Sequence, residues 1–131
     1  MQFLNFAIGS SYTDLVWPEG GYADLHNNFD FTALYFEPAN ATLRLSWRKS
    51  AGDWAAREPW AELHLAFEGV SYLHLQPRTP KYLLSEDACL THLCRTPPEM
   101  RVVDPREEFE NIYLNERAQP DYDLLLYFQS E

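Results

Sequence analysis

Apolar and polar residues alternate strictly between Thr42 and Arg48. Leu43, Leu45 and Trp47 occupy the odd positions, and each residue between them is polar. Because a pleated strand sends successive side chains to opposite faces, these three residues are expected to point into a core. The pattern predicts a β-strand with one covered face, and therefore a fold based on sheets.

A second strand is predicted upstream, from Phe29 to Phe36, where aromatic residues are dense. The segment between the two strands, Glu37–Asn40, contains Pro38. Proline lacks an N–H donor and has a fixed φ, which suits a turn. We therefore expect these two strands to form a hairpin.

Two further strands are expected downstream, at Ala61–Phe67 and Val70–Gln76. Alternation within each strand selects the apolar residues that face the core. The inward candidates are Leu63, Leu65, Phe67, Leu73 and Leu75.

The loop between these two strands decides their register. A two-residue turn at Glu68–Gly69 sends the two sets of leucines to different faces, because a shift of one residue reverses every side chain. A three-residue loop at Phe67–Gly69 sets Leu63 opposite Leu73 and gives Gly69 a left-handed conformation that glycine tolerates. We prefer the three-residue loop.

The chain changes character after the proline residues Pro77 and Pro80. Ser85 followed by two acidic residues predicts the start of a helix, and Pro97–Pro98 ends it by about Thr96. Leu90 and Leu93, at i and i+3, would share one face of this helix. The remaining segments are predicted as a short edge strand and a last hairpin: Val102–Val103, then Glu110–Asn115 with Tyr122–Gln129.

These elements predict one β-rich domain over residues 1–131. The chain is long enough to bury a core, and 46% of its residues are hydrophobic. We expect a mainly β fold, either an antiparallel curved sheet or a two-layer β-sandwich or roll, with one or two short helices.

The charge balance limits the partners of the protein. It carries 20 acidic and 10 basic residues, for a formal net charge of -10. This balance excludes a general nucleic-acid binder and disfavours anionic membranes. The longest apolar run, Leu124–Phe128, is far too short to span a bilayer. Because no basic residue precedes the apolar N-terminal stretch and two cysteines make no disulfide scaffold, we expect a cytoplasmic protein.

Residues with catalytic or metal-binding potential are few. No Gly-x-Ser-x-Gly elbow and no glycine-rich phosphate loop occur in the sequence. Cys89, His92 and Cys94 lie close in sequence, but a structural zinc site needs four ligands. We predict no enzyme activity, no catalytic residue, no metal and no cofactor.

One alternative uses the histidines of the expected hairpin. In the preferred register Glu62 faces His74, and His64 is a diagonal neighbour of His74 on the exposed face. Such a cluster would serve a small enzyme or a ligand-binding β-barrel. Its residues are also ordinary for the outer face of an amphipathic sheet, which is the simpler interpretation.

The connection from Arg48 to Pro59 is long for a hairpin and carries its own aromatic residue, Trp54. Such a loop is either a flap packed onto the sheet or a recognition surface. Exposed aromatic residues dominate binding hot spots. Tryptophan is highly buried on average, which favours the flap.

Four segments carry a resemblance to known proteins: Leu34–Pro38, Leu43–Trp47, Leu65–Val70 and Ser85–Asp87. With them, the region from Phe29 to Leu93 resembles small acidic bacterial immunity-type proteins of toxin–immunity systems. The resemblance implies a non-enzymatic protein that binds another protein, and it brings no catalytic motif. An acidic inhibitor can imitate nucleic acid and be steered to a basic nuclease.

The sequence therefore predicts a domain that binds another protein. In the most specific form of this prediction, the partner is a basic toxin, and an acidic and aromatic surface of the domain occludes it. We expect a monomer or weak homodimer; a subunit that self-associates through an exposed β-edge is a third hypothesis. The residues predicted to bind the partner are Asp53, Trp54, Glu58, Trp60, Glu62, His64 and His74.

Overall fold

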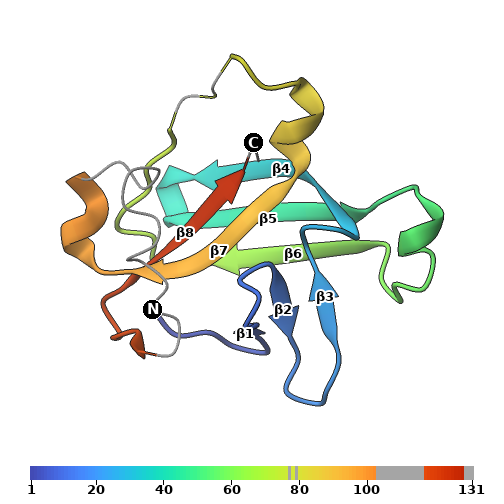
Figure 1. Cartoon of the computed structure of the whole chain (residues 1–131). Coiled ribbons are helices and arrows are strands. Elements are labelled where there is room, and N and C mark those ends of the chain that lie inside the picture. The colour runs from blue at the N-terminus through green and yellow to red at the C-terminus, as the bar shows by residue number, and fades with distance from the viewer. Residues whose placement is uncertain (77, 79, 103–116, 129–131) are drawn as a thin grey trace.

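The computed structural model of the chain describes residues 1–76, 78, 80–102 and 117–128 (Figure 1). Its strands form three antiparallel sheets, so the predicted mainly β class is confirmed. The first sheet contains β1 (Ala7–Ile8), β2 (Asp14–Val16) and β3 (Tyr22–Asp24). The central sheet contains β4 (Phe29–Glu37), β5 (Thr42–Lys49) and β6 (Glu62–Phe67), and the third contains β7 (Leu90–Thr96) and β8 (Asp123–Phe128).

The helical segments among the described residues are all short 3₁₀ helices of three or five residues. They are η1 (Pro38–Asn40), η2 (Asp53–Ala55), η3 (Leu84–Ala88) and η4 (Pro98–Val102). None of the helices in the described part of the chain has the length and apolar character needed to cross a bilayer.

The predicted hairpin of β4 and β5 is confirmed, with η1 as its turn. Pro38 begins η1, and Ala41 ends it in a left-handed conformation with φ 52°. On β5 the predicted inward residues Leu43, Leu45 and Trp47 are all buried. Burial of each such side chain contributes about 1.5–3 kcal/mol to folding.

A β-bulge interrupts β4 at Thr32. The partner of Phe31 is Trp47 and the partner of Ala33 is Ser46, so Thr32 is an extra residue in the ladder. Its hydroxyl donates to the carbonyl oxygen of Ser46 at 3.1 Å. The bulge lets Phe31 and Leu34, three positions apart, both pack against the core.

Strand β6 pairs with β5 and not with the segment after it. Leu65 lies opposite Leu45 and is buried, as predicted, and Leu63 and Phe67 are partly buried against the core. The predicted strand at Val70–Gln76 is wrong, because no ladder includes it.

The chain after β6 turns away from the edge of the sheet. Gly69 has the predicted left-handed conformation, with φ 64°, and the Val70 N–H donates to the carbonyl oxygen of Ala41. Val70 is thus tied to the η1 turn and not to β6. Leu73 reaches the core, but Leu75, predicted to point inward, is 62% exposed.

The predicted helix from Ser85 to Thr96 is wrong beyond its first turn. Only η3 is helical there, and strand β7 begins at Leu90. Leu90 and Leu93 are both fully buried, as their spacing indicates, but a β-bulge at Thr91 produces this common orientation. The partners of Leu90 and His92 are the adjacent residues Phe128 and Tyr127, so Thr91 is the extra residue.

Strand β8 falls within the predicted strand Tyr122–Gln129, but its partner is β7. The segment expected to pair with it, Glu110–Asn115, lies outside the described residues. Val102, predicted in an edge strand, belongs to η4 instead, and Val103 lies outside the described residues.

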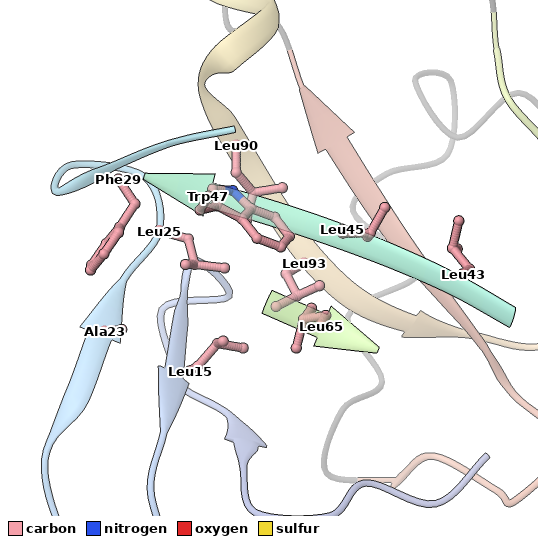
Figure 2. Close-up of a cluster of buried hydrophobic side chains, with 10 residues drawn as sticks. All are labelled: Leu15, Ala23, Leu25, Phe29, Leu43, Leu45, Trp47, Leu65, Leu90 and Leu93. Atoms are coloured by element: carbon pink, nitrogen blue, oxygen red, sulfur yellow. The ribbon is translucent and has the colours of Figure 1, made fainter. Parts of the chain in front are cut away.

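The β7–β8 ribbon crosses one face of the central sheet, and the short β1–β3 sheet lies beside them (Figure 1). The rings of Phe31 and Phe128 meet between these layers, with centroids 4.8 Å apart. All three sheets contribute to one buried cluster, drawn in Figure 2: Leu15, Ala23, Leu25, Phe29, Leu43, Leu45, Trp47, Leu65, Leu90 and Leu93. The predicted antiparallel β fold is thus built from three open sheets around one core.

Candidate functional site

An open hollow of about 460 Å³ lies between the β2–β3 hairpin and the β5–β6 connection. Four aromatic side chains line it, together with one carboxylate, one guanidinium and an amide. These lining residues are Trp17, Tyr22, Trp54, Trp60, Glu58, Arg57 and Asn28, and the lining is completed by Gly20, Gly21 and Pro59. We call this the aromatic hollow.

Trp54 is held in place although its side chain is 70% exposed. It lies in η2, and its indole Nε1 donates to the carbonyl oxygen of Asn27 at 2.8 Å. Its ring packs over Gly52 so closely that a Cβ at Gly52 would overlap the ring atoms. Trp54 therefore presents a large aromatic face with little freedom left to lose on binding.

The other aromatic residues of the hollow come from the β2–β3 hairpin and from the β5–β6 connection. Trp60 is 43% exposed, and its ring packs with that of Trp17 in a T-shaped arrangement, with centroids 5.4 Å apart. Tyr22, at the start of β3, is 61% exposed. The β2–β3 turn is closed by hydrogen bonds from the Trp17 N–H to Gly21 O and from the Gly20 N–H to Trp17 O.

Glu58 supplies the carboxylate of the hollow. Its Oε1 accepts a hydrogen bond from Asn28 Nδ2 at 2.6 Å. The Ser50 N–H donates to the carbonyl oxygen of Asn28, so the connection between β5 and β6 is joined to the turn before β4. These contacts fix the carboxylate beside the tryptophan rings without neutralising it.

The structure brings together three of the seven residues predicted to bind a partner. Trp54, Glu58 and Trp60 all line the aromatic hollow. Asp53 is exposed in η2 beside Trp54 and does not line it. The expectation that the connection forms a flap packed onto the sheet is wrong for Trp54, since most of its surface faces solvent.

Glu62 and His64 lie elsewhere, on the outer face of β6. His64 Nδ1 lies 2.8 Å from Ser46 Oγ on β5, and His64 Nε2 lies 3.6 Å from Glu62 Oε2. Both side chains are about half exposed. Ser46 reaches His64 because the two residues are direct cross-strand partners. A serine, an imidazole and a carboxylate thus follow one another on an open surface.

His74 does not join that group. It is exposed in the segment after β6, and among the described residues no hydrogen bond or ion pair connects it with Glu62 or His64. The predicted facing of Glu62 and His74 depended on a hairpin that does not form. Glu62 instead lies opposite Arg48 on β5.

Cys89 and His92 lie near His26, whereas Cys94 is fully buried. His26 Nδ1 donates to the carbonyl oxygen of Leu90 at 2.7 Å, so it carries a proton and takes none from Cys89 Sγ, 3.4 Å away. Burial, followed by the charges of Glu86, Asp30 and Asp24, raises the pKa of Cys89.

Burial also raises the pKa of Cys94, to about 12. The two thiols are therefore protonated and weakly nucleophilic at neutral pH. No group of three metal-ligating side chains occurs in the portion of the chain that the structure describes.

The hollow also contains three residues that were not predicted from the sequence: Trp17, Tyr22 and Asn28. The signal for the first two was the pair Gly20–Gly21, which has φ values of 101° and 86° and turns the chain between β2 and β3. A pair of glycines is typical of a tight hairpin turn. Nothing in the sequence indicates that Asn28 meets Glu58, thirty residues away.

Comparisons of the chain with protein-family models, with curated proteins and with solved structures give no match. The geometry of the hollow and the net charge of the chain therefore carry the functional inference.

Proposed function

We propose that this protein is a non-enzymatic binding module that docks a basic partner protein against the aromatic hollow. The observation that carries the proposal is the fixed, solvent-facing ring of Trp54, held by Asn27 and Gly52. In its most specific form, the proposal is an immunity protein that neutralises a toxin by covering the toxin's active surface.

The composition of the hollow supports binding of a protein. Tryptophan and tyrosine are enriched at interface hot spots, and contiguous exposed aromatic surface marks interaction sites. Trp54, Trp60 and Tyr22 provide such a surface. Because Trp54 is already ordered, binding costs less conformational entropy than it would for a mobile loop.

The net charge of -10 supports a basic partner. Long-range attraction raises the association rate and suppresses acidic competitors. Asp53 and Glu58 place negative charge at and beside the hollow. The proposal includes action in the cytoplasm as a monomer or weak homodimer, in line with the two free cysteines.

The proposal is tested by comparing the wild type with a Trp54→Ala/Trp60→Ala variant, each immobilised and exposed to extract from cells that make the protein. Tyr35→Ala is the matched control, because Tyr35 is 60% exposed on β4 and does not line the hollow. We expect a basic protein that the wild type and Tyr35→Ala retain and the double variant loses.

The recovered protein is then purified and titrated. We expect the double variant to weaken binding at least about 30-fold, equivalent to about 2 kcal/mol. Affinity for the wild type should fall as salt rises. Equal binding by the double variant, or an affinity that does not change with salt, would contradict the proposal. Relief of growth arrest on co-expression tests the toxin form.

One observation favours a second candidate function, hydrolysis by Ser46. Its hydroxyl faces His64 Nδ1, and Glu62 lies beyond the imidazole, in the order that activates a serine nucleophile. These side chains do not line the aromatic hollow and lie on an open surface, so no described cavity offers them a substrate site. Labelling of Ser46 by a fluorophosphonate, absent in His64→Ala, would support hydrolysis, and no labelling would exclude an activated Ser46.

A further inference from the structure

We propose that the aromatic hollow binds the guanidinium group of an arginine side chain supplied by the partner. This inference rests on the proposed function and names the chemical group that the site recognises. Three features of the hollow lead to it: its aromatic faces, its fixed carboxylate and its size.

Aromatic faces attract cations, because the ring quadrupole places negative potential above and below the plane. Tryptophan is the strongest of these partners, and the hollow contains Trp54 and Trp60 with large exposed fractions. A planar guanidinium stacks on such rings, which the ammonium of lysine does not.

Glu58 adds a carboxylate at the same place. Its Oε1 is occupied by Asn28, and among the described residues its side chain makes no second hydrogen bond or ion pair, which leaves Oε2 for a ligand. A charge-assisted hydrogen bond from a guanidinium N–H to this oxygen would set the direction of the incoming side chain. The hollow, at about 460 Å³, lies in the range of sites that hold one small group.

Arg57 is the feature that opposes a cation. It lines the hollow, and no ion pair or cation–π contact involves it in the part of the chain that the structure describes. Its charge therefore repels an incoming guanidinium. Removal of that charge should strengthen binding, whereas the same substitution should weaken the binding of an anion.

The test is a titration of the whole protein with acetyl-Gly-Arg-Gly-amide, followed through the indole N–H signals of Trp54 and Trp60 in ¹H–¹⁵N NMR spectra. The citrulline peptide is the matched ligand, since citrulline keeps the shape of arginine and loses its charge. We expect saturable shifts of both signals, at least about tenfold weaker binding of the citrulline peptide, and intermediate binding of the lysine peptide.

Three variants accompany the titration. Glu58→Gln keeps the acceptor for Asn28 and removes the charge, and we expect several-fold weaker binding of the arginine peptide. Arg57→Gln should strengthen it. Glu68→Gln, which neutralises an exposed carboxylate outside the hollow, should leave it within about twofold. Equal binding of the arginine and citrulline peptides, or no shift of either indole, overturns the inference.

The two proposals fail in different ways. If a protein partner depends on Trp54 and Trp60 but the arginine peptide does not shift their signals, the module stands and the arginine site is wrong. If the peptide binds as described and no protein depends on the two tryptophans, the hollow is an arginine site, and the proposal of a protein-docking surface is wrong.

Discussion

At the scale of the residue, the placement of Trp54 depends on the absence of a side chain at Gly52. The indole ring occupies the space that a Cβ would need. Gly52 therefore leaves room for the ring, and the carbonyl oxygen of Asn27 accepts a hydrogen bond from its Nε1–H. A surface tryptophan is in this way given one orientation.

We predict that Gly52→Ala displaces the Trp54 ring from its position over residue 52 and leaves the buried core unchanged. The Nε1–H of Trp54 should then lose its hydrogen bond to Asn27, and its indole N–H signal and hydrogen-exchange protection should change. The free energy of unfolding should fall by less than about 1 kcal/mol, as at other surface sites. An unchanged Trp54 indole signal in the variant would contradict this account.

His92 gives the stability of the fold a dependence on pH. Burial, followed by the nearby charge of His26, lowers the pKa of His92 below 6.5 in the folded protein. The unfolded chain therefore binds a proton more readily, and the contribution of His92 to stability is complete above about pH 6.5 and is lost as the pH falls below it.

We predict that wild type loses stability faster than His92→Gln as the pH falls from about 7 to 5, because only wild type carries this imidazole. Urea unfolding at several pH values measures the difference between the two proteins. Carboxylates common to both proteins cancel in that difference. A difference that stays constant with pH would show that His92 titrates alike in the folded and unfolded states.

At the scale of the element, two β-bulges determine which residues face the core. Thr32 on β4 and Thr91 on β7 are each an extra residue in a ladder. Each bulge puts two apolar residues three positions apart on the same face. On β7 this spacing imitates a helix, and it misled the prediction for Leu90 and Leu93.

We predict that the chain tolerates loss of Thr91 better than loss of Cys94. Deletion of Thr91 turns β7 into a regular strand with Leu90 and Leu93 still on the core face. Deletion of Cys94 removes a fully buried residue and reverses the side chains on one side of it, so that either Leu93 leaves the core or Arg95 and Thr96 change faces, at a cost of about 2–5 kcal/mol. Urea unfolding should show the Cys94 deletion at least about 2 kcal/mol less stable than the Thr91 deletion; equal stabilities would refute the bulge assignment.

At the scale of the whole molecule, negative charge both guides partners and opposes folding. The net charge of -10 produces self-repulsion that is screened when salt is added. The screening length falls from about 30 Å at 0.01 M salt to about 10 Å at 0.1 M.

We predict that the free energy of unfolding rises over this range of NaCl concentration, because repulsion in the compact state weakens. The double variant Glu68→Lys/Asp121→Lys is the control. Each substitution at these exposed sites adds two positive units, so the net charge changes from -10 to -6. Its gain in stability with salt should be smaller than that of wild type, and an equal gain would point to an effect other than net charge.

The sequence by itself determined the β class, the β4–β5 hairpin and the inward stripe of β5, because these depend on alternation and turn residues within short segments. It also predicted Trp54, Glu58 and Trp60 as binding residues, and the structure brings these three together in the aromatic hollow. Only the tertiary structure decided that β6 pairs with β5, that Leu90 and Leu93 lie on a bulged strand, and that Trp54 faces solvent. Those outcomes depend on contacts between residues far apart in the chain, such as Trp54 with Asn27 and Asn28 with Glu58, and no local pattern encodes them.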